Sequence, residues 1–192
     1  MSLALLVLLG VRPPDESALR EAFSKEIQSK EASTRIEAIK RLAGSKEEKT
    51  IVLLVACLKD EAKDVQLAAA VALEGCEDGA GAALKPLGEV LTDKKVDPDV
   101  RLSCAKALAK SKYKTVPITS MIAAIGAISN TERHLHKFGA DVTDLLNKCA
   151  GQDFGKGKTT AFLWEQWFDD NKAKFAKDDA TLLEAYRKSS KN

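Results

Sequence analysis

The chain has 192 residues, of which 45% are hydrophobic and 30% are charged, so it can bury a core as one elongated domain with a small appendage. Its 30 basic and 28 acidic residues leave a net charge of +2, which gives no reason to expect a nucleic acid or an anionic membrane as an obligatory partner. The longest interior apolar run, Ile51 to Leu58, is far shorter than the roughly 20 residues of a membrane-spanning helix. We therefore expect no membrane span in the mature chain.

The N-terminus is an apolar segment. Leu3 to Leu9 is an unbroken aliphatic run, and Gly10 to Pro14 follows it. This order is typical of a secretory signal peptide, although a basic segment before the run and a small-x-small cleavage site after it are missing. We expect residues 1–14 to be a signal-peptide remnant and the mature protein to be exported, to the periplasm or beyond. The alternatives are a hydrophobic cap on the first helix pair and a cytoplasmic location.

Residues 15–150 are predicted to form four helix pairs. Pro13, Pro14 and Asp15 open the first helix, because the prolines fix an extended entry and the aspartate can cap. Its buried stripe is predicted to be Leu19, Phe23 and Ile27. Further helices are expected over residues 33–43, 47–59, 63–75, 81–92, 98–110, 117–129 and 131–149. Pro86 falls inside one of them, and it should either kink that helix or mark its true start.

Three of these helices share one pattern. It runs from Thr34 to Leu42, from Val65 to Leu73 and from Val100 to Leu108, with offsets of 31 and 35 residues. Each copy has a long polar residue, a large aliphatic residue beside it, a small residue two positions further on and a closing leucine. A period in the thirties that is filled with helix formers predicts an α-solenoid, in which each unit stacks on its neighbours and the whole presents an extended surface.

The copies resemble the second helix of HEAT repeats, where Asp-Val-Arg precedes spaced alanines and a leucine. Asp99-Val100-Arg101 is a full match, Asp64-Val65-Gln66 keeps two positions, and Ser33-Thr34-Arg35 keeps the arginine. The resemblance covers about residues 15 to 150. It implies an all-α fold, a short right-handed α-solenoid of about four HEAT-like helix pairs. It also implies that the aspartates and arginines of successive units form a ladder.

The cysteines show no metal-binding spacing. They are Cys57, Cys76, Cys104 and Cys149, and no two of them form a Cys-x-x-Cys pair, so we expect no zinc site. Cys104 takes the position of Ala38 and Ala69 in the repeat, which indicates a small buried side chain. We expect free, buried thiols, with a disulfide of Cys76 as the alternative.

Residues 151–192 differ from the repeats in composition. Seven of the ten aromatic residues of the chain lie here: Phe154, Phe162, Trp164, Trp167, Phe168, Phe175 and Tyr186. The segments Gly151 to Gly155, Phe162 to Phe168 and Asn171 to Phe175 resemble the C-terminal signature of HEAT-repeat proteins exported by planctomycete-type bacteria. The match departs from that signature at Phe168, where a tryptophan is frequent, and in the inserted residues 156–160.

The aromatic residues Trp164, Trp167, Phe168 and Phe175 fall on one stripe of a helix. We expect them to form a C-terminal cap that closes the open end of the solenoid. The alternative is an exposed aromatic platform for a glycan or a peptide. Asp178 and Asp179 are expected to cap a separate last helix.

Three patterns bear on catalysis. Gly151 to Thr159 ends in Gly-Lys-Thr like a phosphate-binding loop, but the glycine spacing is one residue too long and a helix is expected before it. His134 and His136 would point to different faces of a helix, which makes a poor metal pair. The carboxylates are expected at capping and surface positions. We therefore expect no catalytic, cofactor or metal site.

The sequence instead favours a non-catalytic protein-binding scaffold or adaptor that acts through the concave face of the second helices. The polar residues expected at this site are Arg35, Lys40, Gln66, Arg101, Lys106 and Lys110. One alternative is an enzyme or enzyme subunit on a HEAT-like fold, such as a chromophore lyase or a DNA glycosylase. Another is a nucleic-acid binder that uses the basic stretch 94–114, and a third is a structural spacer. An exposed apolar patch would favour the binder, a buried polar pair the enzyme, and an evenly charged surface the spacer.

Overall fold

The computed structural model describes residues 15–76, 78–128, 132–155 and 161–189, and the regular elements within these ranges are all helical. The α-helices are α2 (Glu16–Glu26), α3 (Ala32–Leu42), α4 (Glu48–Ala56), α5 (Lys63–Glu74), α6 (Leu84–Thr92), α7 (Pro98–Lys110), α8 (Thr115–Gly126), α9 (His136–Ala150) and α10 (Ala161–Ser189). Two short 3-10 turns, Cys57–Lys59 and Arg133–Leu135, extend α4 and precede α9. The predicted signal peptide at residues 1–14 lies outside the described residues.

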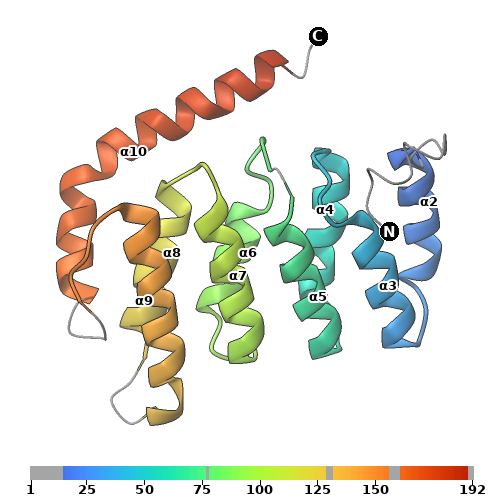
Figure 1. Cartoon of the computed structure of the whole chain (residues 1–192), viewed down its shortest axis with the longest axis horizontal. Helices are drawn as coiled ribbons and strands as arrows, with labels where there is room; N and C mark the ends of the chain where they lie inside the picture. The colour runs from blue at the N-terminus through green and yellow to red at the C-terminus, as the bar shows by residue number, and fades with distance from the viewer. Residues whose placement is uncertain (1–14, 77, 129–131, 156–160, 190–192) are drawn as a thin grey trace, which may run out of the picture.

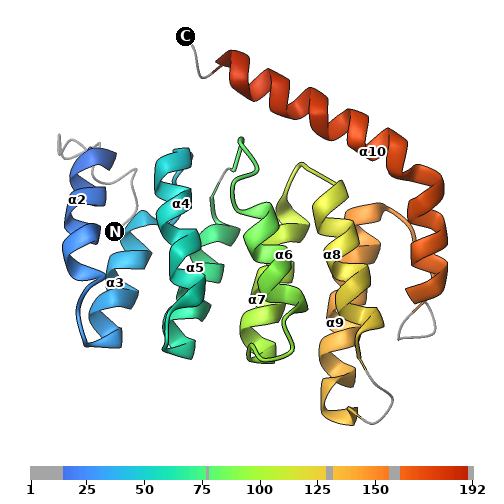
Figure 2. The ribbon, with the colours of Figure 1, turned by 180° about the vertical axis from the view of Figure 1, so that it is seen from behind.

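Helices α2 to α9 form four pairs that stand side by side in two rows. Figure 1 shows the second helices α3, α5, α7 and α9 in front, and Figure 2 shows the first helices α2, α4, α6 and α8 from the other side. The second helices contact one another in an unbroken series, α3 with α5, α5 with α7 and α7 with α9. This arrangement is the short α-solenoid that the repeat predicted.

The ends of the helices follow from local chemistry. Asp15 caps α2 by accepting a hydrogen bond from the Ser17 amide, and Asp97 caps α7, whose first residue is a proline. Pro86 lies in the first turn of α6, so it marks the start of that helix rather than a kink. Gly151 ends α9 with φ of 68°, a left-handed conformation that glycine adopts without strain.

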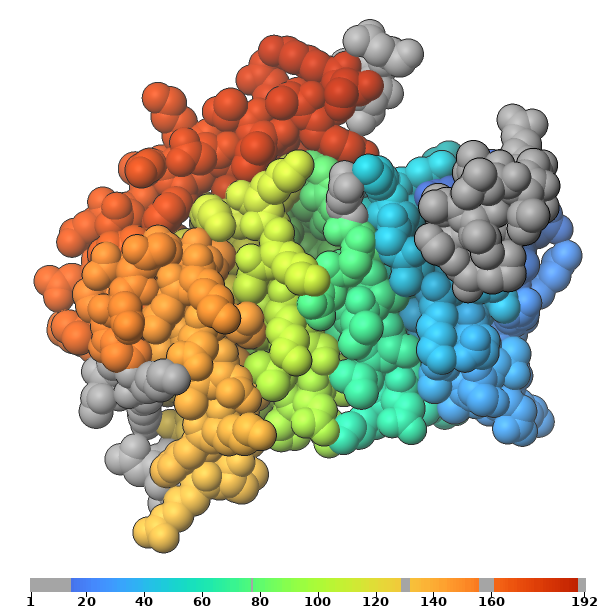
Figure 3. Space-filling model, viewed as in Figure 1, coloured from blue at the N-terminus to red at the C-terminus, as the bar shows by residue number. Residues whose placement is uncertain are grey.

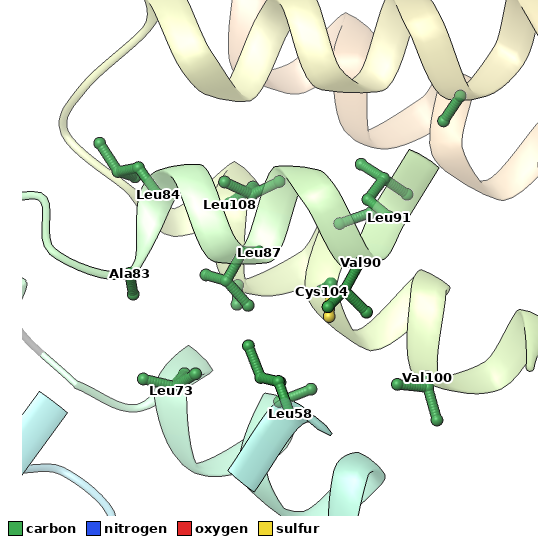
Figure 4. Packing of buried hydrophobic residues seen from close by; sticks show 14 of the residues in the cluster. Leu58, Leu73, Ala83, Leu84, Leu87, Val90, Leu91, Val100, Cys104 and Leu108 are labelled. Atoms are coloured by element: carbon green, nitrogen blue, oxygen red, sulfur yellow. The ribbon is translucent and has the colours of Figure 1, made fainter. Parts of the chain in front are cut away.

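The core explains the repeat pattern. The small residues Ala38, Ala69 and Cys104 are completely buried, which lets neighbouring second helices approach closely. The closing leucines Leu42, Leu73 and Leu108 are buried beside them. Figure 4 shows how the rows join, with Leu87 of α6 directed toward Leu58 and Leu73 of the preceding pair. Each pair thus buries its apolar side against the next.

The last helix differs from the prediction. α10 continues unbroken from Ala161 to Ser189, so the expected separate helix beginning at Asp178 and Asp179 is wrong. Asp179 instead accepts hydrogen bonds from the amides of Lys114 (2.8 Å) and Thr115 (2.9 Å) and caps the start of α8. Figure 1 shows α10 rising beside the last pair and then running across the edge of the solenoid.

The aromatic stripe packs on the last helix pair through contact of α10 with α8. Trp164 is completely buried, with its ring centroid 4.8 Å from that of Phe154 and 5.5 Å from that of Trp167. Phe175 is half-buried and lies against Trp167 and Phe168. These residues form the predicted aromatic capping segment, while Phe162 at the start of α10 is 70% exposed.

Candidate protein-binding face

Arg35 does not face outward as expected. Its side chain is buried, and Nε and Nη2 donate to the two carboxylate oxygens of Asp60 at 2.9 and 2.8 Å. Nη1 donates to the backbone oxygen of Ser29 at 2.8 Å. The planar guanidinium fork matches a carboxylate in this two-point geometry, so Arg35 joins α3 to the segment before α5.

The pair shifts the titration of both groups. Burial opposes ionisation of Asp60, but hydrogen bonds from Arg35 and from the Ala62 amide outweigh it and lower the pKa of Asp60. The hydrogen bond with Asp60 raises the pKa of Arg35 against the opposing effect of burial. Both groups are therefore charged at neutral pH and are saturated by partners inside the chain.

Arg101 is also buried, with other partners. Its Nε donates to the backbone oxygen of Leu91 at 2.8 Å, and its guanidinium lies 4.4 Å from the ring centroid of Phe138. Such stacking is favourable because the negative face of an aromatic ring attracts a cation. Burial lowers the pKa of Arg101. This residue therefore ties α7 to α6 and α9, and it is not available at the surface.

A ladder between units exists and includes Arg35 and Asp99 of the expected residues, but their partners are not the expected ones. The first step is Arg35 with Asp60. The second is Lys63, whose Nζ lies 3.0 Å from an Asp97 oxygen and 3.1 Å from an Asp99 oxygen. These hydrogen bonds raise the pKa of Lys63, and the pKa of Asp97 is lowered by the Asp99 amide and by Lys63. Asp64, the other aspartate expected in the ladder, is exposed at the start of α5.

The remaining predicted site residues lie at the surface to different degrees. Lys40, Lys106 and Lys110 are exposed, whereas Gln66 is half-buried and donates to the Asp60 backbone oxygen at 2.6 Å. Lys40 is paired with Glu37 of its own helix, and Lys110 is paired with Glu74 of α5. These three lysines remain candidates for contact with a partner.

A row of apolar residues lies across the second helices, one turn before Lys40 and Lys106. Ile36, Leu67 and Leu102 occupy the same repeat position and are each half-buried. One turn further on, the equivalent positions are Lys40, Val71 and Lys106, and Val71 is 54% exposed. Equivalent positions lie side by side in a solenoid. We name these six residues of α3, α5 and α7 the second-helix face.

The basic stretch 94–114 is largely engaged within the protein. Lys94 lies 3.8 Å from Glu132, Lys110 lies 2.8 Å from Glu74, and Lys114 donates to the Cys149 sulfur at 3.8 Å. With Arg101 buried, four of its seven basic residues contact groups inside the chain. The acids Glu132 and Glu74 therefore offset part of its charge, while Lys95, Lys106 and Lys112 remain exposed.

The four cysteines are free thiols, as expected. Cys57, Cys104 and Cys149 are buried, while Cys76 is half-buried. Burial raises the pKa of Cys57 to about 11 and that of Cys104 to about 12, so both remain protonated at neutral pH. These side chains serve as small apolar groups in the packing.

The described residues contain no group of three or more His, Cys, Asp or Glu side chains placed to hold a metal ion. His134 and His136 are exposed. The Gly-Lys-Thr segment considered for phosphate binding, residues 157–159, lies outside the described residues. In the part of the chain that the structure describes, no helix is both long enough and apolar enough to cross a membrane.

Sequence reasoning missed three features. Asp60 was not distinguished from the other surface carboxylates, and its separation of 25 residues from Arg35 does not match the repeat offsets of 31 and 35. Val71 interrupts a position that is lysine in the other two copies, and this signal is visible in the sequence. The packing of α10 across the edge of α6 and α7, which creates a cavity there, had no local signal.

The fold defines a short α-solenoid with a helical C-terminal cap. Comparison with protein families agrees: residues 21–109, from α2 to α7, match the family described as HEAT repeats. This segment of the chain thus consists of HEAT-like repeats, a class of structure that generally mediates protein interaction. No curated protein and no solved structure matches the chain.

Proposed function

We propose that this protein is a non-catalytic scaffold that binds another protein through the second-helix face. The observation that carries the proposal is Val71, a large apolar side chain that is 54% exposed at the middle of a helical row. An exposed aliphatic side chain that adjoins half-buried ones offers apolar surface to a partner, because the partner can remove that surface from water. Leu67, one turn before Val71, is half-buried and forms an apolar strip with it.

The lysines around the strip indicate the chemistry of the partner. Lys40 and Lys106 hold the positions equivalent to Val71 in the neighbouring repeats and are exposed. A partner with an apolar anchor flanked by acidic residues would complement this arrangement, since charges at the rim orient binding and raise its rate. We therefore expect an acidic, amphipathic segment on the partner.

The alternatives receive less support. A buried polar pair in the concave groove would favour an enzyme, but the hydrogen-bonding capacity of the buried pair Arg35 and Asp60 is used by internal partners. A chromophore-lyase-like or DNA-glycosylase-like role would need polar groups directed at a substrate. Nucleic-acid binding is disfavoured because much of the basic stretch 94–114 contacts groups inside the chain.

Two matched valines test the proposal. Val71→Asp places a charge on the second-helix face, and Val52→Asp places the same charge on α4 of the first row, where Val52 is 52% exposed. Proteins captured from the native source by the wild-type chain should be lost with Val71→Asp and retained with Val52→Asp. Equal capture by both variants would refute the second-helix face as the binding site.

We further propose that the chain is exported by a bacterium of the planctomycete type. The apolar run Leu3 to Leu9 and the aromatic C-terminal signature support this location. Mass spectrometry of the native protein should find a mature start between Arg12 and Ser17. Recovery of intact Met1 on cytoplasmic material would refute export.

A further inference from the structure

A cavity of about 520 Å³ lies between α10 and the edge of the solenoid. Its walls come from the end of α5, the first half of α6, the end of α7 and the last turns of α10. In the space-filling view, α10 rests along the upper edge of the molecule, above the segment that contains these ends (Figure 3). The volume falls in the range of about 300 to 1,000 Å³ that is usual for small-molecule sites.

The floor of the cavity is apolar. Leu73 of α5 with Leu84 and Leu87 of α6 contribute side chains from the solenoid, and Leu182 and Ala185 contribute from α10. These residues come from three helices that are far apart in the sequence. An apolar chain bound here would be shielded from water on several sides. Removal of apolar surface from water is the usual source of affinity in such sites.

The wall formed by α10 is held in place by specific contacts. The ring of Tyr186 packs directly on Gly79, where an added Cβ would lie only 2.4 Å from the ring. The Tyr113 hydroxyl donates to the Gly79 backbone oxygen at 2.6 Å, and Asp179 anchors α10 to the start of α8. The cavity therefore has a defined wall on the α10 side.

Charge at the cavity is biased toward the positive. Lys46, Lys110 and Lys112 line it and are exposed, against the acids Glu74 and Asp78. Glu74 is paired with Lys110, and both Asp78 oxygens accept amide hydrogen bonds, from Ala82 and Ala83. Within the described part of the chain, Lys112 forms no ion pair. An incoming anion would thus find a cation beside the apolar floor.

We propose that this cavity binds an apolar chain that ends in a free carboxylate, with the chain against Leu73, Leu87 and Leu182 and the carboxylate near Lys112. The site is separate from the second-helix face, and Lys106 of that face does not line it. The chain would therefore combine a protein-binding face with an independent ligand site at its edge.

Titration calorimetry with decanoate tests the proposal on the full chain. The wild-type protein should bind decanoate saturably at one site and bind decylammonium, which has the opposite charge, at least about tenfold more weakly. Ala185→Trp should weaken decanoate binding by about tenfold or more, because the indole would fill the cavity. Ala185 is exposed on α10, so this substitution leaves the solenoid core untouched.

Two charge reversals complete the test. Lys112→Glu should weaken decanoate binding at least about threefold, and Lys95→Glu, at an exposed lysine outside both the cavity and the second-helix face, should leave it unchanged. Absence of saturable decanoate binding, equal binding by the Ala185→Trp variant, or equal affinity for decylammonium would each overturn the proposal. Protein capture through the second-helix face does not depend on any of these outcomes.

Discussion

At the scale of single residues, the two arginines of the repeat show that equivalent positions in the sequence can have different surroundings in the structure. Arg35 and Arg101 occupy the same place in their repeats and both are buried. Arg35 meets the carboxylate of Asp60, whereas Arg101 meets a backbone oxygen and the ring of Phe138. A guanidinium accepts either setting because it can donate in its plane and stack on its face. The shared role is to join neighbouring units.

The pair of Arg35 and Asp60 predicts a dependence of stability on pH. The pKa of Asp60 in the folded protein is below its ordinary value of 3.8, so the pair contributes fully above that value and its contribution is lost as pH falls through the folded pKa. The free energies of unfolding of wild type and Asp60→Asn, measured in urea, should differ at pH 7 and converge as the pH is lowered below about 3.8. Asp64→Asn, at an exposed position, is the control. A constant difference between wild type and Asp60→Asn from pH 7 to pH 2 would contradict the ion pair.

Trp164 predicts a buried fluorescence signal. It is completely buried in the aromatic cluster, whereas Trp167 is half-buried. Emission should be blue-shifted and poorly quenched by iodide, and Trp164→Ala should cost about 3 to 5 kcal/mol because it leaves a large cavity. Phe162→Ala, at a 70% exposed position on the same helix, is expected to have little effect. Water-like emission in the wild type would show that the cap does not bury its indole.

At the scale of elements, α10 both closes the end of the solenoid and lies across its edge. Its first turns pack the aromatic cluster on α8, and its later turns cross the edge of the solenoid. Asp179 supplies the N-cap that the sequence before α8 lacks, since Lys114 at that position offers no capping hydrogen bond. The two helices therefore depend on each other through residues, Lys114 and Asp179, that are 65 positions apart in the sequence.

Asp179→Ala is expected to lower the free energy of unfolding by about 0.5 to 2 kcal/mol, as for the loss of other N-caps. The adjacent Asp178 is exposed, and Asp178→Ala should be close to neutral. Chemical denaturation measures both, and hydrogen exchange should show faster opening at the start of α8 for Asp179→Ala alone. Equal behaviour of the two variants would rule out the cap between helices.

At the scale of the whole molecule, the solenoid is held by contacts between neighbours. Each second helix touches the next, and the charged steps from Arg35 to Asp60 and from Lys63 to Asp97 follow the same direction. In such a stack, stability is close to a sum of unit and interface terms, so inner units are supported on two sides and terminal ones on one.

Leucine truncations test this order of stability. Leu73 is buried in the second pair, and Leu73→Ala should cost about 2 to 5 kcal/mol. Leu183 is half-buried near the end of α10, and Leu183→Ala should cost less because the terminal helix shares fewer contacts. Equal losses of unfolding free energy in the two variants, measured by denaturant unfolding, would contradict the proposed order of stability.

Much of this molecule was determined by local sequence. The bounds of α5 and α7, the start of α6 near Pro86 and the stacking of Ala69 and Cys104 follow from apolar period, caps and side-chain size, which act within a few residues. Residues 21–109 match HEAT repeats, which confirms the resemblance for that part of the range 15–150.

Only the tertiary structure decided which distant groups meet. The partner of Arg35, the helix that Asp179 caps and the cavity beneath Leu182 depend on how units rotate against one another and where α10 crosses the edge. Period and propensity describe the face that a helix buries, but they do not give the position of a second element along that face. That position results from the packing of all the units together, because each contact is made between residues with no local signal for one another.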